Sequence, residues 1–213
     1  FEYCAKTDYG QPIPVITAKS NENVEIKQSN DMNVPSYVIV TNAKTGVKVT
    51  YTIKHEYNNT VTRAPIVGLK GETGIRDGFK VLYGTPSASY IPQPVNGPEN
   101  LVDGDFSTRW AASGDGVTCQ IDLGEVLDID GIAVSIYGGN ERQNMFRLQT
   151  SEHGVKFTEV YDGKSTGLSG DNYESYMFKA RARYIRYVGF GSTEGEWSSV
   201  LELGAIVRKQ VEK

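Results

Sequence analysis

The sequence predicts an all-β protein with two domains, a small β-sandwich over residues 1–85 and a jelly-roll β-sandwich over residues 86–213. Three observations predict this class. The 213 residues include 13 Tyr and 23 Gly, and Thr and Val are frequent. Short stretches alternate apolar and polar residues between turns, and no long stretch has helical periodicity. β-branched and aromatic residues fit the pleated surface of a sheet, while Gly supplies its turns.

In the first domain the clearest strand covers residues 47–57, where Val49, Tyr51 and Ile53 alternate with polar residues. This period of two indicates an antiparallel strand with one buried face. Residues 42–46, which end in Gly46, predict a hairpin loop from a strand at 37–41. Further short strands are expected at residues 13–18, 24–26, 64–69 and 79–83. Such a domain suits an Ig-like spacer or the trailing β-domain of a larger enzyme.

In the second domain short strands follow one another between turns, as in a sandwich or jelly roll. A Pro-rich loop at residues 91–98 lies near its start. The expected strands are residues 118–123, 131–137, 146–151, 157–161, 173–178, 184–190 and 201–207.

Composition excludes several functions. The net charge of −4 lacks the basic footprint of a nucleic-acid binder. No apolar run approaches the roughly 18–20 residues of a membrane span. Two cysteines exclude a disulfide-dense scaffold and a four-cysteine zinc site, and two histidines argue against a multi-histidine metal centre. The chain begins at Phe1 without a basic and apolar leader, so we expect a processed protein or a fragment of a longer one.

The order of features in residues 85–207 resembles the discoidin, or coagulation factor V/VIII type C, family, whose bacterial relatives include the family 32 carbohydrate-binding modules. At residues 151–154 the chain has Ser-Glu-His-Gly where the family often has Ser-x-Asp-Gly, which we expect to alter only a surface turn. Residues 1–80 are not covered. The matching stretches are NLVDGDFSTRWAAS at 100–113, CQIDLGEVLDIDGIAVSIYGG from Cys119, FRLQTSEHGVKFTEVYDG from Phe146, ARYIRYVGFG at 182–191 and WSSVLELGAIV at 197–207.

The resemblance implies an eight-stranded jelly roll that binds glycans, or in some members lipids or proteins, without catalysis. We therefore expect a polysaccharide-binding module, secreted or at the cell surface, that targets an appended glycoside hydrolase or polysaccharide lyase. The chain is expected to be a monomer within a larger multidomain protein. One alternative is an adhesion module for a protein or cell-surface glycan. A second is the catalytic β-domain of a lyase, for which His55, Tyr57 and Tyr51 offer the one local set of bases.

A structural calcium site is expected at the motif DGDFSTRW. Asp103, Asp105 and Thr108 supply hard oxygen ligands on a tight turn, and the backbone carbonyl of Leu101 adds another. Related modules close such a site with an acidic residue at the start of the last strand, which Glu202 matches. The alternative is that the aspartates only cap a turn. The resemblance also implies that Trp110, which ends the motif, packs in the core.

The glycan surface is expected at loops from one end of the sandwich. Aromatic rings pack against sugar faces, and Arg and Asn bind hydroxyls or carboxylates. We expect the contacts to come from Trp197, Arg142, Asn144, Asn140 and Tyr90, with uronate-containing and neutral ligands both open. The alternatives are a packed Trp197 and a solvated Arg142.

Two further groups of residues have simpler interpretations. Arg181, Arg183 and Arg186 could read an anionic polymer, but an exposed strand face is the commoner arrangement. Cys119 lies in an alternating strand and is expected to be a buried thiol.

Overall fold

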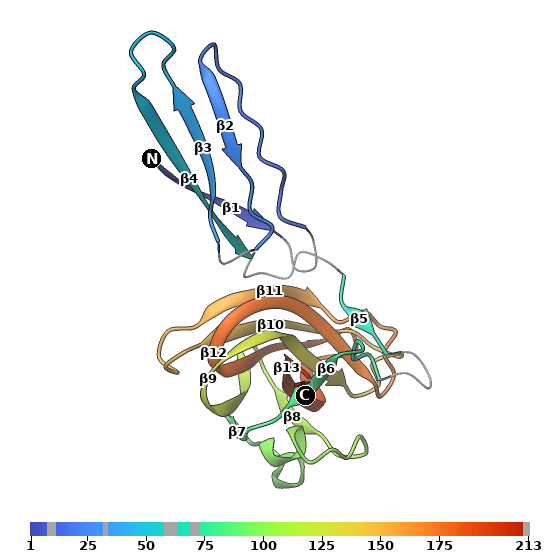
Figure 1. Ribbon diagram of the computed structural model, residues 1–213. Helices are drawn as coiled ribbons and strands as arrows, with labels where there is room; N and C mark the ends of the chain where they lie inside the picture. Colours follow the sequence, from blue (N-terminus) through green and yellow to red (C-terminus); the bar gives the residue numbers. More distant parts are fainter. Residues whose placement is uncertain (8–11, 32–33, 58–63, 69–72, 211–213) are drawn as a thin grey trace. The chain divides into compact units, whose positions relative to one another are not determined.

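The computed structural model describes residues 1–7, 12–31, 34–57, 64–68 and 73–210, and it confirms the all-β class (Figure 1). The chain forms two compact units, Phe1–Asn58 and Asn59–Lys213. None of the helices in the described part of the chain is long and apolar enough to cross a membrane.

The first unit contains a mixed sheet of four strands in the order β1-β4-β3-β2. β1 runs parallel to β4, and the other neighbours are antiparallel. In the described residues this is one sheet, not the two packed sheets of the expected sandwich. The strands are β1 (Glu2–Thr7), β2 (Asn23–Lys27), β3 (Ser36–Thr41) and β4 (Lys48–Tyr57).

The hairpin between β3 and β4 forms as predicted. Asn42 Oδ1 accepts hydrogen bonds from the N–H groups of Lys44 and Thr45, and Gly46 has a φ of 69°, which favours glycine. The strand predicted at residues 13–18 does not form. There the backbone N–H of Ile16 is bonded to the side chain of Gln28, so the segment makes a side-chain contact instead of a ladder.

The second unit is dominated by two strands of 20 residues each, β9 and β12. Two short 3-10 helices, η1 (Pro94–Asn96) and η2 (Pro98–Leu101), precede β8. The strands are β5 (Ile66–Val67), β6 (Phe79–Leu82), β7 (Thr85–Ala88), β8 (Trp110–Ser113), β9 (Val117–Ile136), β10 (Asn144–Ser151), β11 (Thr158–Lys164), β12 (Tyr173–Ser192) and β13 (Trp197–Arg208).

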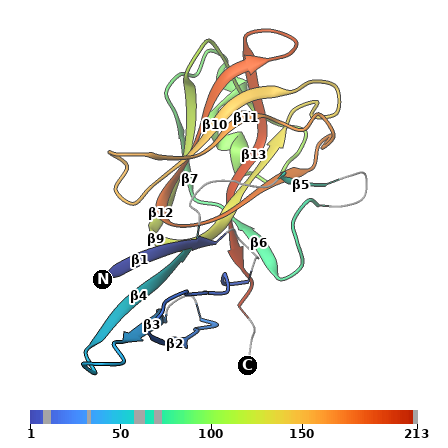
Figure 2. The same ribbon diagram turned by 90° about the horizontal axis from the view of Figure 1, so that it is seen from above.

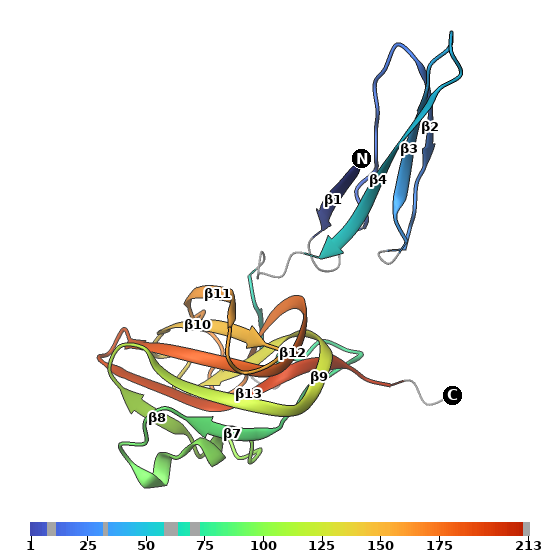
Figure 3. The ribbon, with the colours of Figure 1, turned by 90° about the vertical axis from the view of Figure 1, so that its left-hand side faces the viewer.

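β9 and β12 each run through both layers of the sandwich (Figures 2 and 3). The C-terminal half of β9 pairs with the N-terminal half of β12 and with β13. The N-terminal half of β9 pairs with the C-terminal half of β12 and with β7, and this half of β12 also pairs with β10. Register shifts after Met177 and Ala182 allow the bend, as bulges do where strands change sheet. The pairs of strands predicted at 118–123 and 131–137, and at 173–178 and 184–190, are therefore halves of single strands.

Aromatic side chains fill the core between the layers. Trp110 is fully buried, as predicted, and meets Tyr187 edge to face at 6.1 Å between ring centroids. Phe146 stacks on the same tyrosine at 4.8 Å. Cys119 is a buried free thiol, also as predicted, and its burial raises its pKa, whereas Cys4 is an exposed free thiol.

The units divide at Asn58 and Asn59, upstream of the boundary expected between residues 85 and 86. The difference arises because β5 pairs with β12 and β6 pairs with β13. Phe79 and Val81 pack on buried Ile206, and the hydroxyl groups of Tyr83 and Tyr173 are hydrogen-bonded. Residues 64–68 and 73–85 therefore belong to the second unit, although the strands predicted here were assigned to the first.

This boundary predicts different stabilities for two fragments. A fragment of residues 59–213 keeps β5 and β6, whereas one of residues 86–213 exposes the apolar groups that β6 covers. Losing even one buried side chain of this size costs about 2 kcal/mol. We expect the shorter fragment to melt about 4–8 °C lower by differential scanning calorimetry. Equal melting temperatures would contradict the assignment of residues 64–85 to this unit.

Candidate glycan-binding site

One end of the second unit carries a cleft of about 650 Å³. Its walls come from the loops that join β9 to β10, β11 to β12 and β12 to β13. Asn140 and Arg142, two of the predicted sugar contacts, lie in it together. The lining residues are Tyr137, Gly138, Asn140, Glu141, Arg142, Asp171 and Glu194.

The ring of Tyr137, which lines the cleft, contacts two guanidinium groups. Its side chain is exposed, and the Cζ atoms of Arg109 and Arg142 lie 4.2 Å and 4.9 Å from its ring centroid. Arg142 Nε also donates to the backbone carbonyl of Tyr137 at 2.9 Å. Cation–π contacts of this kind hold a guanidinium group in place without neutralising it. Sequence reasoning missed Tyr137 because it ends an apolar strand, where a packed ring is expected.

The cleft pairs a cation with several acceptors. Glu141, Asp171 and Glu194 line it with Arg142, yet within the described chain no carboxylate lies at ion-pair distance from that guanidinium. Free guanidinium N–H groups suit a ligand carboxylate, and the side-chain oxygens suit sugar hydroxyls. The arrangement therefore fits a sugar unit that carries both groups.

Asn144 has a different role from the one predicted. It is fully buried, and its Nδ2 donates to Tyr187 Oη and to the carbonyl of Ser199, both at 3.1 Å. The N–H of Tyr137 donates to the same carbonyl at 3.3 Å. Asn144 thus closes the base of the β9–β10 loop, and this corrects the expectation of a surface contact with sugar.

Trp197 and Tyr90 are exposed, but neither lines the cleft. Trp197 begins β13 opposite Ser113 of β8, with 37% of its surface exposed. Tyr90 follows β7, where Ser89 is bonded to the backbone of Thr118. Their contact with glycan stays a prediction.

The predicted metal ligands form a closed turn. Asp103 accepts hydrogen bonds from Asp105 N–H at 2.9 Å and from Thr108 Oγ1 at 2.8 Å. The Asp105 carboxylate accepts from the N–H and the hydroxyl of Ser107 instead. Leu101 is fully buried in η2. Within the described ranges, no three Asp, Glu, His or Cys side chains come together as a metal-binding group.

Glu202 behaves unlike an ordinary buried carboxylate. It is fully buried, with Asp103, Gly104 and the Tyr83 hydroxyl around it, yet neither carboxylate oxygen has a hydrogen bond of good geometry. Burial, joined by the charge of Asp103, raises the pKa of Glu202 to about 7. Two carboxylates side by side, one of them orphaned, are what a hard cation stabilises, so these residues fit calcium.

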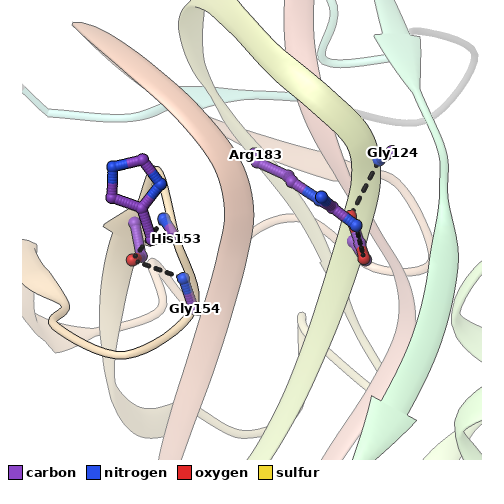
Figure 4. Close-up of polar contacts among 6 residues, drawn as sticks. Gly124, His153, Gly154 and Arg183 are labelled. Carbon is purple, nitrogen blue, oxygen red and sulfur yellow. Dashed lines mark hydrogen bonds and ion pairs between the residues drawn. The ribbon is translucent and has the colours of Figure 1, made fainter.

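Two arginines of the β12 cluster, Arg183 and Arg186, bond to side chains of the neighbouring strand β9. Arg183 binds both oxygens of Asp122 on β9, at 2.7 Å and 2.8 Å, and the N–H of Gly124 donates to the same carboxylate (Figure 4). Arg186 binds Gln120 Oε1 in the next row of the ladder. These contacts support the interpretation of the cluster as a strand face.

The turn that departs from the family pattern is also ordinary. The Ser151 hydroxyl accepts hydrogen bonds from the N–H groups of His153 and Gly154 (Figure 4).

In the first unit, His55 is buried and bonded to Ser36 at 2.8 Å, while the side chain of Tyr57 lies outside the described part.

Comparison with known families decides the classification. The F5/8 type C domain profile matches residues 85–203, more than half of the chain. The chain belongs to this family. A search of curated proteins finds no significant match.

Three solved structures that are similar to the chain contain carbohydrate-binding modules. A truncated AlyQ with CBM32 and alginate lyase domains is 32% identical, with a TM-score of 0.57; the match covers 62% of this chain and 34% of that one. The AlyQ CBM32 in complex with 4,5-unsaturated mannuronic acid is 36% identical, with a TM-score of 0.55 and coverage of 60% and 96%. A pectin-binding module is 26% identical, with a TM-score of 0.55 and coverage of 59% and 91%.

The ion pair of Asp122 and Arg183 predicts a pH dependence. The guanidinium of Arg183 lowers the pKa of Asp122 to about 2, below its ordinary value of 3.8. The stability from this pair is therefore complete above about pH 4 and is lost as the pH falls toward 2. Because the pair is solvent-screened, we expect Arg183→Gln to lower the free energy of unfolding only slightly at pH 7 and less at pH 2.

The measurement is urea unfolding at pH 7 and pH 2. Arg181→Gln, an exposed neighbour, is the control. An equal loss for Arg183→Gln at both pH values would contradict the pairing.

Proposed function

We propose that the chain is a carbohydrate-binding module whose cleft binds a uronate-containing glycan. The observation that carries this proposal is Arg142, held on Tyr137 in the cleft without a carboxylate partner. Its free N–H groups match a uronate carboxylate, and Asn140 with the neighbouring carboxylates matches the hydroxyls. The similarity to modules that bind mannuronic acid and pectin supports the same ligand class.

The biological role that we propose is targeting. The chain spans 34% of the AlyQ chain that joins a CBM32 to an alginate lyase domain. A module tethered to such an enzyme raises the effective concentration of the catalyst at its polymer. An extracellular location, where such polymers occur, follows from this role.

We also propose a structural calcium ion held by Asp103 and Glu202. A bound cation would neutralise the orphaned carboxylate and tie the Asp103–Thr108 turn to β13. Asp105 is turned toward Ser107, so its part in the site requires a change of rotamer.

Arg142 provides the sharpest test of the glycan site. Loss of a charged hydrogen-bonding group costs about 1.5–3 kcal/mol, so Arg142→Ala should weaken binding to oligomannuronate or oligogalacturonate at least about tenfold. Binding is measured by calorimetry, with neutral galacto- and gluco-oligosaccharides alongside.

Arg181→Ala, which removes an exposed arginine from β12, is the control and should bind like the unchanged protein. Trp197→Ala tests whether the sugar instead binds outside the cleft, near the start of β13. Unchanged binding by Arg142→Ala, or a loss confined to Trp197→Ala, would move the site out of the cleft.

Calcium should raise the melting temperature. At a free calcium concentration 100 times the Kd, mass action contributes about 2.7 kcal/mol, or about 5–11 °C. Glu202→Gln should abolish the response, and in chelator it should melt no lower than the unchanged protein because the buried charge is gone. Glu152→Gln, on an exposed turn, is the control. A full calcium response in Glu202→Gln would exclude the site.

A further inference from the structure

We propose that Gln143 and Thr193 are positioning residues for the cleft. Together with Ser165 they form a polar clasp that fixes the three cleft loops relative to one another. The inference rests on the proposed glycan site and adds the residues that hold it in shape. Neither Gln143 nor Thr193 lines the cleft.

The first part of the clasp is a reciprocal pair between two loops. The N–H of Thr193 donates to the carbonyl of Gln143 at 2.9 Å, and the N–H of Gln143 donates to Thr193 Oγ1 at 3.1 Å. These residues adjoin Arg142 and Glu194, which face the cleft from opposite loops. The pair therefore sets the spacing between the cation and one of the acceptors.

The second part of the clasp adds the β11–β12 loop. Gln143 Nε2 donates to the carbonyl of Ser165 at 2.8 Å. Its side chain also packs on Gly167, where a Cβ atom would lie 3.2 Å from Gln143 Cγ and where φ is 76°. The same loop carries Asp171 into the cleft. One glutamine thus bonds to both of the other cleft loops.

The bonds made by Gln143 and Thr193 are distinct from the fold's main supports. Buried Ser165 also bonds to Asn144 through its N–H and its hydroxyl, and these two bonds do not involve Gln143 or Thr193. The base of the β9–β10 loop is closed by Asn144, and the aromatic core is built around Trp110 and Tyr187. The bonds of the clasp lie at the surface or are only partly buried, so they contribute little to folding. Their effect falls on binding, because a shallow site depends on loops that are ordered before the ligand arrives.

The experiment compares paired substitutions in the full chain with oligomannuronate as the probe. Thr193→Val removes the hydroxyl at constant shape, Thr193→Ser keeps it, and Gln143→Leu removes the amide. We expect Thr193→Val and Gln143→Leu each to weaken binding about three- to tenfold, and Thr193→Ser to restore it. The double variant should lose less than the product of the single losses, because the bonds share one network. Thr158→Val, at an exposed position of β11, is the control.

Hydrogen exchange supplies a readout that a purely structural role would not move. Amides of the three loops should exchange faster in free Thr193→Val and Gln143→Leu, and saturating ligand should slow them again, while exchange in the core strands stays unchanged. Faster exchange throughout the unit would instead indicate general destabilisation and overturn the positioning role.

Two binding results would overturn the inference. One is full affinity in Thr193→Val and Gln143→Leu while Arg142→Ala loses it, which leaves the proposed function intact. The other is equal loss in Thr193→Ser and Thr193→Val, since the hydroxyl would then not be the cause. If the unchanged chain binds no glycan, or binds it equally after Arg142→Ala, the proposed function itself fails and the clasp fails with it.

Discussion

The pairing of β9 with β12 is the constraint on which the cleft depends. The two strands face each other from Tyr173 opposite Ser135 to Gly189 opposite Val117, and both bend from one layer into the other. Because they turn back, the loops that leave their ends converge on one edge of the sandwich. Trp110, Phe146 and Tyr187 fill the space inside the bend. A change that straightened either strand would therefore separate the cleft loops even if their own residues were unaltered.

Buried polar groups of this unit differ in how far they are satisfied by hydrogen bonds. The Glu174 carboxylate accepts from the N–H and hydroxyl of Thr166 and from Tyr176 Oη at 2.6 Å. Asn144 donates two hydrogen bonds from its amide nitrogen to neighbouring strands, although its Oδ1 atom has no hydrogen-bond partner. Glu202 is as deeply buried as either but has no such bonds. An uncompensated buried carboxylate is costly, and the contrast with Glu174 is the physical reason to expect a cation there.

Local features of this fold could be predicted from the sequence, and features that depend on distant partners could not. The alternation in β4, the hairpin at Gly46 and the polar loop that carries Asn140 and Arg142 are visible in short stretches. Tyr137 looks like the end of a core strand until Arg109 is placed on its ring. The roles of Asn144 and of residues 64–85 depend on pairing partners far along the chain, which composition and period do not reveal.

The arginines show why counting charges does not locate the site. In the densest basic stretch of the sequence, Arg183 is neutralised by a carboxylate on the adjacent strand and Arg186 is bonded to the neutral Gln120, while Arg181 is exposed to solvent. Arg142 is held by an aromatic ring and a carbonyl, neither of which cancels its charge. In a chain of net charge −4, with three carboxylates around the same cleft, long-range attraction to a polyuronate is weak. Affinity for an acidic glycan must therefore come from direct contact. Direct contact depends on the spacing of the loops that carry Arg142 and the carboxylates of the cleft.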